Sequence, residues 1–177
     1  MAGFKSVWAT LTTDVRSTDV EGIGRIRWED DKAFRWVNNP ITNFTPGPGD
    51  LVCHTFTNGT LNTELGLIDK PATALLGLLA GVSVATIAAN TGTTPNTYGW
   101  IQVWGHHSAV NVTPANTQTT AAPVAGNALI AVNAVQTYAA TGDAMGTAPR
   151  YTRRLLLLDS VAGSTAVQAC AVLVQCL

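Results

Sequence analysis

The sequence predicts an all-β protein, in the form of a small β-barrel or sandwich of short antiparallel strands with an extended N-terminal arm. Short apolar runs rich in β-branched residues follow one another, and Gly, Pro or Asn separates nearly all of them. No long window shows a 3.6-residue apolar period with helix caps. Regularly spaced short strands are typical of sandwiches and barrels. The expected strands are residues 51–56, 65–68, 73–79, 82–89, 98–105, 108–113, 128–135, 153–160 and 166–177.

The composition is that of a chain with few charges. Its 177 residues are enough for one domain, or for a domain and an arm, and 46% of them are apolar. Charged residues make up 12%, about half of the usual fraction in soluble proteins, and the net charge is −1. This balance indicates neither a nucleic-acid nor a membrane partner, and surfaces so poor in charge are typical of proteins covered by other subunits.

The three cysteines, Cys53, Cys170 and Cys176, match no zinc or redox spacing. Cys170 and Cys176 are expected on one face of a strand, too far apart for a disulfide. We therefore predict buried free thiols and a reducing compartment during assembly. The opening residues MAGFKSVWATLTT contain one lysine but no apolar signal-peptide core, so we predict no signal peptide.

One stretch, Ala72–Ala89, is 18 residues long without a charge and contains Gly77 and Gly81 at the spacing of membrane helix dimers. It has no flanking basic cluster, and its second half is rich in Val, Thr and Ile, which favour strands. We therefore predict no membrane span. The stretch is expected to form two strands that meet near Gly81, or one long bent strand.

Charge is concentrated near the N-terminus, where residues 1–35 hold 12 of the 21 charged residues, six of each sign. Within this region, GRIRWEDDKAFRWVNN predicts a hairpin with EDDK as its turn. The following NPITNFTPGPGD has three prolines and two glycines, which predicts a loop or hinge. The predicted organisation is an arm with a hairpin at residues 1–40, a Pro/Gly hinge at 41–49 and a β-barrel or sandwich domain at 50–177.

The arm combines mixed charge with tryptophan, arginine and phenylalanine, which is the composition of an interface. An edge hairpin folded onto its own domain is an equally good interpretation, and both stay open. If the arm is an interface, its contact residues, with two tryptophans added from a later strand, are Trp8, Arg25, Arg27, Trp28, Arg35, Trp36, Trp100 and Trp104.

The segment YGWIQVWGHH, residues 98–107, supplies those two tryptophans and predicts a strand. Alternation places Ile101 and Val103 on the face expected to meet the core. Trp100, Gln102 and Trp104 share the opposite face, which is either a second layer of core or an exposed stripe that packs on a neighbour. Core is the default expectation for tryptophan.

No constellation of catalytic or metal-binding residues is recognisable. His106 and His107 are adjacent, so in a strand they point to opposite faces and cannot chelate one metal, and His54 is the only further histidine. The sequence contains no nucleophile elbow, no glycosidase carboxylate pair and no Gly-rich phosphate loop. We therefore predict a protein that is not an enzyme and has no cofactor.

Three segments in order, AGVSVATIAAN, YGWIQVWGHHSAV and AGNALI, resemble the capsid decoration (cement) proteins of tailed bacteriophages. The resemblance covers residues 49–177, and its clearest part is Tyr98–Gln102 with Gly105. It implies a structural virion protein on the outer capsid surface, made in the host cytoplasm, with no catalytic residues. The implied partners are the major capsid protein and further copies of the chain, as a trimer or dimer. The resemblance does not cover the first 48 residues, and the cysteines and the His-His pair are not features of the family.

The leading hypothesis is therefore a cement protein that binds neighbouring major capsid subunits, with the arm reaching over a capsid or cement subunit. Affinity would come from many copies acting together. One alternative is a tail or head-fibre receptor-binding domain, and another is a soluble β-sandwich binding module outside any virus. The fold class does not separate them, since β-barrels serve all three.

Overall fold

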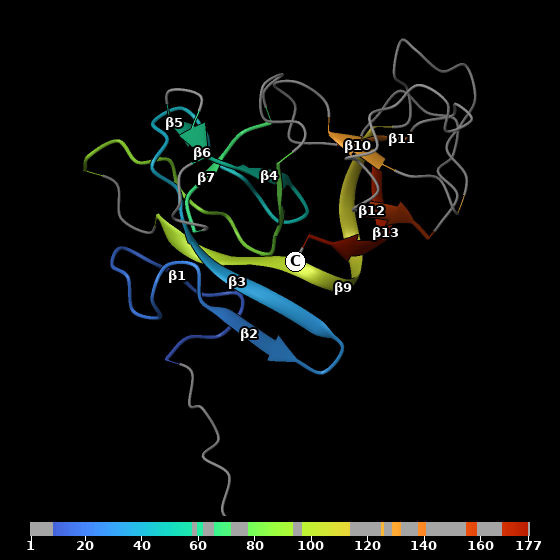
Figure 1. Ribbon diagram of the computed structural model, residues 1–177, viewed down its shortest axis with the longest axis horizontal. Coiled ribbons are helices and arrows are strands. Elements are labelled where there is room, and N and C mark those ends of the chain that lie inside the picture. The colour runs from blue at the N-terminus through green and yellow to red at the C-terminus, as the bar shows by residue number, and fades with distance from the viewer. Residues whose placement is uncertain are drawn as a thin grey trace, which may run out of the picture.

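A computed structural model confirms the all-β class. It describes residues 9–57, 60–61, 66–71, 78–93, 97–113, 125, 129–131, 138–140, 155–158 and 168–176. None of these residues is helical, so they include no helix long and apolar enough to cross a membrane. The strands shown in Figure 1 are β1 (Val15–Arg16), β2 (Ile26–Glu29), β3 (Lys32–Asn38), β4 (Leu51–His54), β5 (Phe56–Thr57), β6 (Thr60–Leu61), β7 (Ile68–Asp69), β8 (Leu79–Ser83), β9 (Tyr98–Thr113), β10 (Leu129–Ala131), β11 (Tyr138–Ala140), β12 (Leu155–Leu157) and β13 (Gln168–Gln175).

One mostly antiparallel sheet of 11 strands contains all of these except the small β5–β6 pair. Its longest path is β10-β11-β9-β8-β4-β7, and β1, β3 and β13 also pair with β9. The sheet does not close, so the barrel form of the prediction is wrong. The reason is the length of β9, which takes partners on both edges along 16 residues, so that strands branch from it instead of following one another around a ring.

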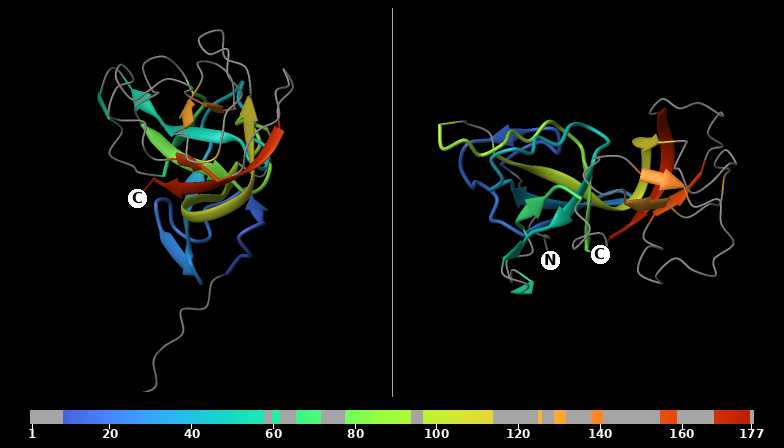
Figure 2. Two further views of the ribbon diagram at one scale, coloured as in Figure 1. Left: turned by 90° about the vertical axis from the view of Figure 1, so that its right-hand side faces the viewer. Right: turned by 90° about the horizontal axis from the view of Figure 1, so that it is seen from above.

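Strand β9 joins the two strands expected at residues 98–105 and 108–113 into one bent strand. His106 and His107 continue the pairing with Leu173 and Val172 of β13. The bend lies at Gly105, which has φ 93° and is buried. An added Cβ there would overlap the carbonyl oxygen of Asp31, so both the backbone and the close approach require glycine. Figure 2 shows β9 (yellow) curving so that its second half stands beside β13 (red).

The expected hairpin is present, with its turn at Asp30 and Asp31 as EDDK predicted. Strand β3 of this hairpin also pairs with β9 from Ala33 to Asn38, with a β-bulge between Ala33 and Phe34. The described part of the predicted arm is therefore not extended, because its second strand is a neighbour of the longest strand of the sheet. The physical reason is apolar burial, since Trp36 lies fully inside the protein.

The segment predicted as a hinge is fastened to the sheet. The Asn39 side-chain amide donates to the carbonyl oxygens of Phe44 and Ala88, at 2.7 and 3.1 Å. Phe44 is buried, and Gly49 N–H donates to the Ser83 carbonyl at 2.8 Å. These contacts hold the Pro/Gly segment against β8, so in the structure it is a fixed connection between β3 and β4.

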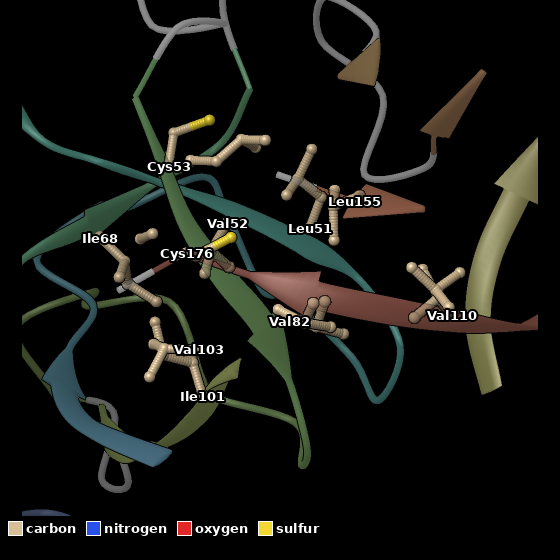
Figure 3. Close-up of a cluster of buried hydrophobic side chains, with 14 of the residues drawn as sticks. Leu51, Val52, Cys53, Ile68, Val82, Ile101, Val103, Val110, Leu155 and Cys176 are labelled. Carbon is tan, nitrogen blue, oxygen red and sulfur yellow. The ribbon is translucent and has the colours of Figure 1, made fainter. Parts of the chain in front are cut away.

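The main core lies on one face of the sheet. It contains Ile101 and Val103, as alternation predicted, and the fully buried strand β8 from the charge-free stretch. The three cysteines are buried and free, as expected. Burial raises the pKa of the Cys53 thiol to about 12, with smaller contributions from Asp69 and Cys176. Figure 3 shows the two thiols of Cys53 and Cys176 among the aliphatic side chains of this core.

Candidate interaction surface

The face of β3 and β9 opposite the main core carries a cluster of aromatic side chains. Trp36 and Trp100 are both fully buried, with ring centroids 5.1 Å apart in an edge-to-face arrangement. Tyr98 stacks on Trp36 at 6.4 Å, and Phe34 completes the cluster. The tryptophan face of residues 98–104 is thus a second layer of core along its first half, and Trp36 and Trp100 are unavailable to a partner.

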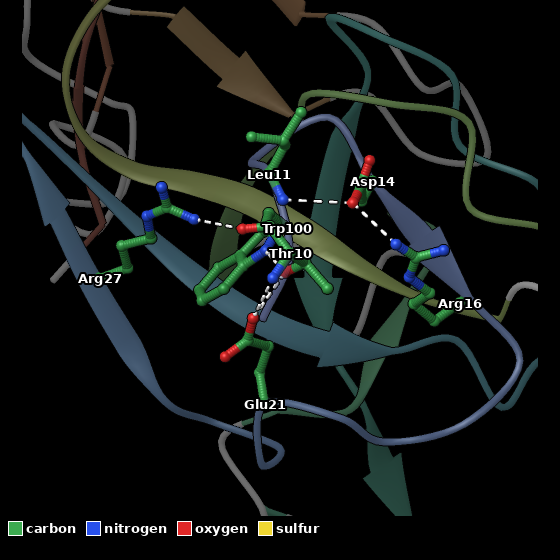
Figure 4. A network of polar contacts seen from close by, with 7 residues as sticks. All are labelled: Thr10, Leu11, Asp14, Arg16, Glu21, Arg27 and Trp100. Atoms are coloured by element: carbon green, nitrogen blue, oxygen red, sulfur yellow. Dashed lines mark hydrogen bonds and ion pairs between the residues drawn. The ribbon is translucent and has the colours of Figure 1, made fainter. Parts of the chain in front are cut away.

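Residues 9–24, which we call the clasp, cover this cluster. Trp100 Nε1 donates to the Thr10 hydroxyl and Trp36 Nε1 donates to the Asp19 carboxylate, both at 2.9 Å. The Thr10 hydroxyl in turn donates to the Glu21 carboxylate at 2.7 Å. Figure 4 shows Thr10 lying against the Trp100 ring with Glu21 beside it. Both indole N–H groups are satisfied by the clasp, which is what allows the two rings to be buried.

The arginines predicted at an interface contact other residues of the same chain. Arg27 donates to the Thr10 carbonyl at 2.6 Å, pairs with Glu29 and lies 5.9 Å from the centroid of the Trp100 ring. Arg25 is exposed and donates to the Glu21 carbonyl at 3.2 Å. Arg27 on β2 and Arg25, which directly precedes β2, therefore both bind to the clasp.

Arg35 is buried on the opposite side of β3, facing the main core. Its Nη1 lies 3.3 Å from His54 Nε2. A guanidinium has no acceptor, so His54 Nε2 accepts and its proton sits on Nδ1. Burial lowers the pKa of Arg35, an effect that Cys176 partly offsets. Arg35 is thus a core residue and not a surface contact.

Two of the predicted tryptophans are exposed. Trp28 lies on strand β2, which pairs only with β3 in the described part of the chain, and 58% of its surface is accessible. Trp104 is 37% accessible, although it lies only four residues after the buried Trp100 on β9. Trp8 falls outside the described residues. The sequence had placed Trp28 and Trp104 in one group with Trp36 and Trp100, and the structure separates the two exposed tryptophans from the two buried ones.

A second apolar surface was not predicted. We call it the leucine face, formed by the outward side of β12, β13 and the second half of β9. Leu156 is opposite Leu173, and Leu173 is opposite His106. Leu156 and Leu158 are 38% and 39% accessible, whereas the alternate residues of the same strands are buried in the core. Four consecutive leucines, 155–158, were the signal, because a strand apolar on both faces needs cover on both.

The chemistry of the described residues is sparse. No group of three or more His, Cys, Asp or Glu side chains in them could hold a metal ion. His106 is exposed on the leucine face and His107 is half-buried on the other side. Burial, aided by Lys32 and His106, lowers the pKa of His107 to about 4. Its Nδ1 accepts the Ala109 N–H at 3.2 Å, which also favours the neutral ring.

Comparisons of the chain with models of protein families, with curated proteins and with solved structures give no match.

Proposed function

We propose that this chain is a structural virion protein that binds the outer surface of a phage capsid and cements neighbouring major capsid subunits. The observation that carries the proposal is the resemblance of Tyr98–Gln102 with Gly105 to tailed-phage cement proteins. These residues form the first half of β9, on which the sheet is organised. The low charge of the chain and its exposed apolar side chains support a protein that works while covered by other subunits.

The capsid contact belongs on the β2 side of the molecule. Trp28 is the most accessible tryptophan of the described chain, and Arg25, one residue ahead of β2, is also exposed. Tryptophan and arginine are the residue types that dominate binding energy at protein interfaces. Strand β2 also lies beside only one described neighbour, so its outer edge can approach a capsid strand.

Co-sedimentation with expanded shells of the phage's own major capsid protein tests this proposal. We expect saturable binding by the full chain and at least tenfold weaker binding by Trp28→Ala, as for a central interface tryptophan. Val20→Ala, an exposed apolar residue on the clasp, is the matched control and keeps wild-type binding. Point variants replace removal of residues 1–40, because that region supplies β3 and the cover of Trp36 and Trp100.

The same experiment separates the alternatives. Failure of the full chain to bind shells, together with binding on a glycan array, would support the receptor-binding domain. A soluble binding module outside any virus has one observation in its favour, since residues 9–40 are packed on the sheet. A stable monomer that binds neither shells nor glycans would support that module.

A further inference from the structure

The clasp is attached to the rest of the protein mainly by polar contacts. Within residues 9–24 only Thr10 and Glu21 are buried, and both are polar. Leu11 and Val20 are 66% and 45% accessible, and Val15 packs against the main core but is only partly buried. Segments with few buried apolar contacts open at a lower free energy than the core of a protein. Release of the clasp therefore leaves the main core almost intact.

The clasp is also bonded to itself. Thr10 donates to the Glu21 carboxylate through both its backbone N–H and its hydroxyl, at 2.8 and 2.7 Å, which joins positions 11 residues apart. Within that loop the Asp14 N–H donates to the Leu11 carbonyl at 3.0 Å, and the Asp14 carboxylate accepts the Leu11 N–H at 3.2 Å. Compact surface loops whose ends lie close together are held by internal contacts of this kind. None of these bonds reaches the sheet, so they persist when the loop moves away from it.

Gly22 separates this loop from residues that are anchored to the sheet. It has φ 93°, and an added Cβ would meet nothing within 4 Å. Two residues later, the Gly24 N–H donates to the Trp36 carbonyl at 2.8 Å and fixes the approach to β2. The Asp19 carboxylate links the two sides, because it accepts both Trp36 Nε1 and the Gly22 N–H, at 2.9 and 2.8 Å. A few residues that absorb a backbone rotation next to an anchored strand form a hinge, and Asp19 holds this one closed.

We propose that residues 9–21 are a hinged cover, which opens as a unit about Gly22 while the sheet stays folded. Opening breaks the two indole hydrogen bonds and separates β1 from β9, where only two residues pair. It exposes the aromatic cluster, whose residue types are enriched at the centres of protein interfaces. The closed clasp is then an autoinhibitory contact, since it withholds these rings from a partner. The proposal concerns the protein in the absence of a shell and does not rest on capsid binding.

Native-state hydrogen exchange of the full chain, followed by NMR in water and in low concentrations of urea, is the test. We expect the indole N–H groups of Trp36 and Trp100 to have similar protection factors, at least about 100-fold below those of the β9 amides bonded to β3. Their protection should also depend less on urea, because opening exposes less surface than unfolding. Thr10→Val should speed the exchange of Trp36, and Asp19→Ala that of Trp100, each by about tenfold. Thr18→Val, at an exposed position of the clasp, is the control and leaves both rates unchanged.

Two outcomes would overturn the proposal. Indole protection equal to that of the β9 amides, with the same dependence on urea, would mean that the clasp separates only when the whole protein unfolds. If Thr10→Val speeds only Trp100 and Asp19→Ala speeds only Trp36, each bond frays by itself and the clasp does not move as a unit. Circular dichroism checks that both variants are folded, and the wild-type protection factors decide the first point without them.

Discussion

The outer faces of the two halves of β9 are covered to different extents. In the first half, Trp100 and its neighbour Trp36 lie beneath the clasp, which is part of the same chain. In the second half, beyond the bend at Gly105, β9 pairs with β13, and His106, Ser108 and Ala109 are exposed. The first half thus has a second layer from the same chain as far as Gln102, whereas the outward residues just after the bend are exposed.

This difference shows why aromatic composition alone did not locate the surface. Trp36 and Trp104 are both tryptophans on strands of the same sheet, yet one is fully buried and the other is 37% accessible. The distinction comes from the clasp, whose Thr10 and Asp19 reach the indole N–H groups of Trp100 and Trp36. A tryptophan becomes a contact residue only where no segment of its own chain covers it.

The largest expected effect is on stability and contrasts the covered and open tryptophans. Trp36→Ala removes a buried ring and its bond to Asp19, and should lower the free energy of unfolding by about 3–5 kcal/mol. Trp104→Ala should cost less than about 1 kcal/mol, because its ring is partly hydrated in the folded monomer. Urea unfolding of the two variants and the wild type measures both losses. Equal losses would mean that the clasp does not protect the first half.

A substitution at Gly105, in the bend between the two halves of β9, should lower the free energy of unfolding by nearly as much. Gly105→Ala places a methyl group against the Asp31 carbonyl and 3.1 Å from Lys32 Cα, at a positive φ. We expect a loss of about 3 kcal/mol, from backbone strain together with overpacking. Gly92→Ala has a similar φ of 81° but open space around it, so it should cost about 1–2 kcal/mol. A Gly105→Ala loss no greater than that of Gly92→Ala would show that the bend can relax.

Removing one hydroxyl group should weaken the attachment of the clasp to the aromatic cluster. Thr10→Val keeps the side-chain volume but removes the acceptor of Trp100 Nε1 and the donor to Glu21. We expect a loss of about 1–2 kcal/mol and greater exposure of tryptophan, read from a red shift of its fluorescence. Thr18→Val, at an exposed position of the same segment, is the control and should be within about 0.5 kcal/mol of wild type. An unchanged Thr10→Val protein would mean that other contacts hold the clasp.

The smallest expected effect is a loss of stability at acidic pH that arises from His107, in the second half of β9. The folded pKa of His107 is about 4, below its unfolded value, so the unfolded chain binds more protons between these values. His107 should therefore add to stability loss as the pH falls from about 6.5 towards 4, by about 1 kcal/mol after allowance for its partial exposure. His107→Gln should flatten the dependence of unfolding free energy on pH in this range. His106→Gln, on the exposed side, should not, and equal slopes in all three proteins would contradict the assignment.

Local sequence signals predicted much of the fold. Alternation identified Ile101 and Val103 as core residues, EDDK identified the turn of the β2–β3 hairpin, and the cysteine spacing predicted free buried thiols. These features depend on residues close together in the chain. The leucines at 155–158 carried a signal as well, since a run apolar on both faces requires cover on both sides. Their exposure could not be predicted without knowing what lies over them.

The sequence by itself thus determined the all-β class, the main turns and which side chains share a face of a strand. The tertiary structure decided that the sheet stays open, that the described part of residues 1–40 belongs to it, and that Arg35, Trp36 and Trp100 are buried. The physical reason is that the two-residue period of a strand determines which side chains share a face, but not which other segment packs over that face. The cover of Trp100 comes from Thr10, 90 residues away in the chain, and no local pattern encodes a contact of that range.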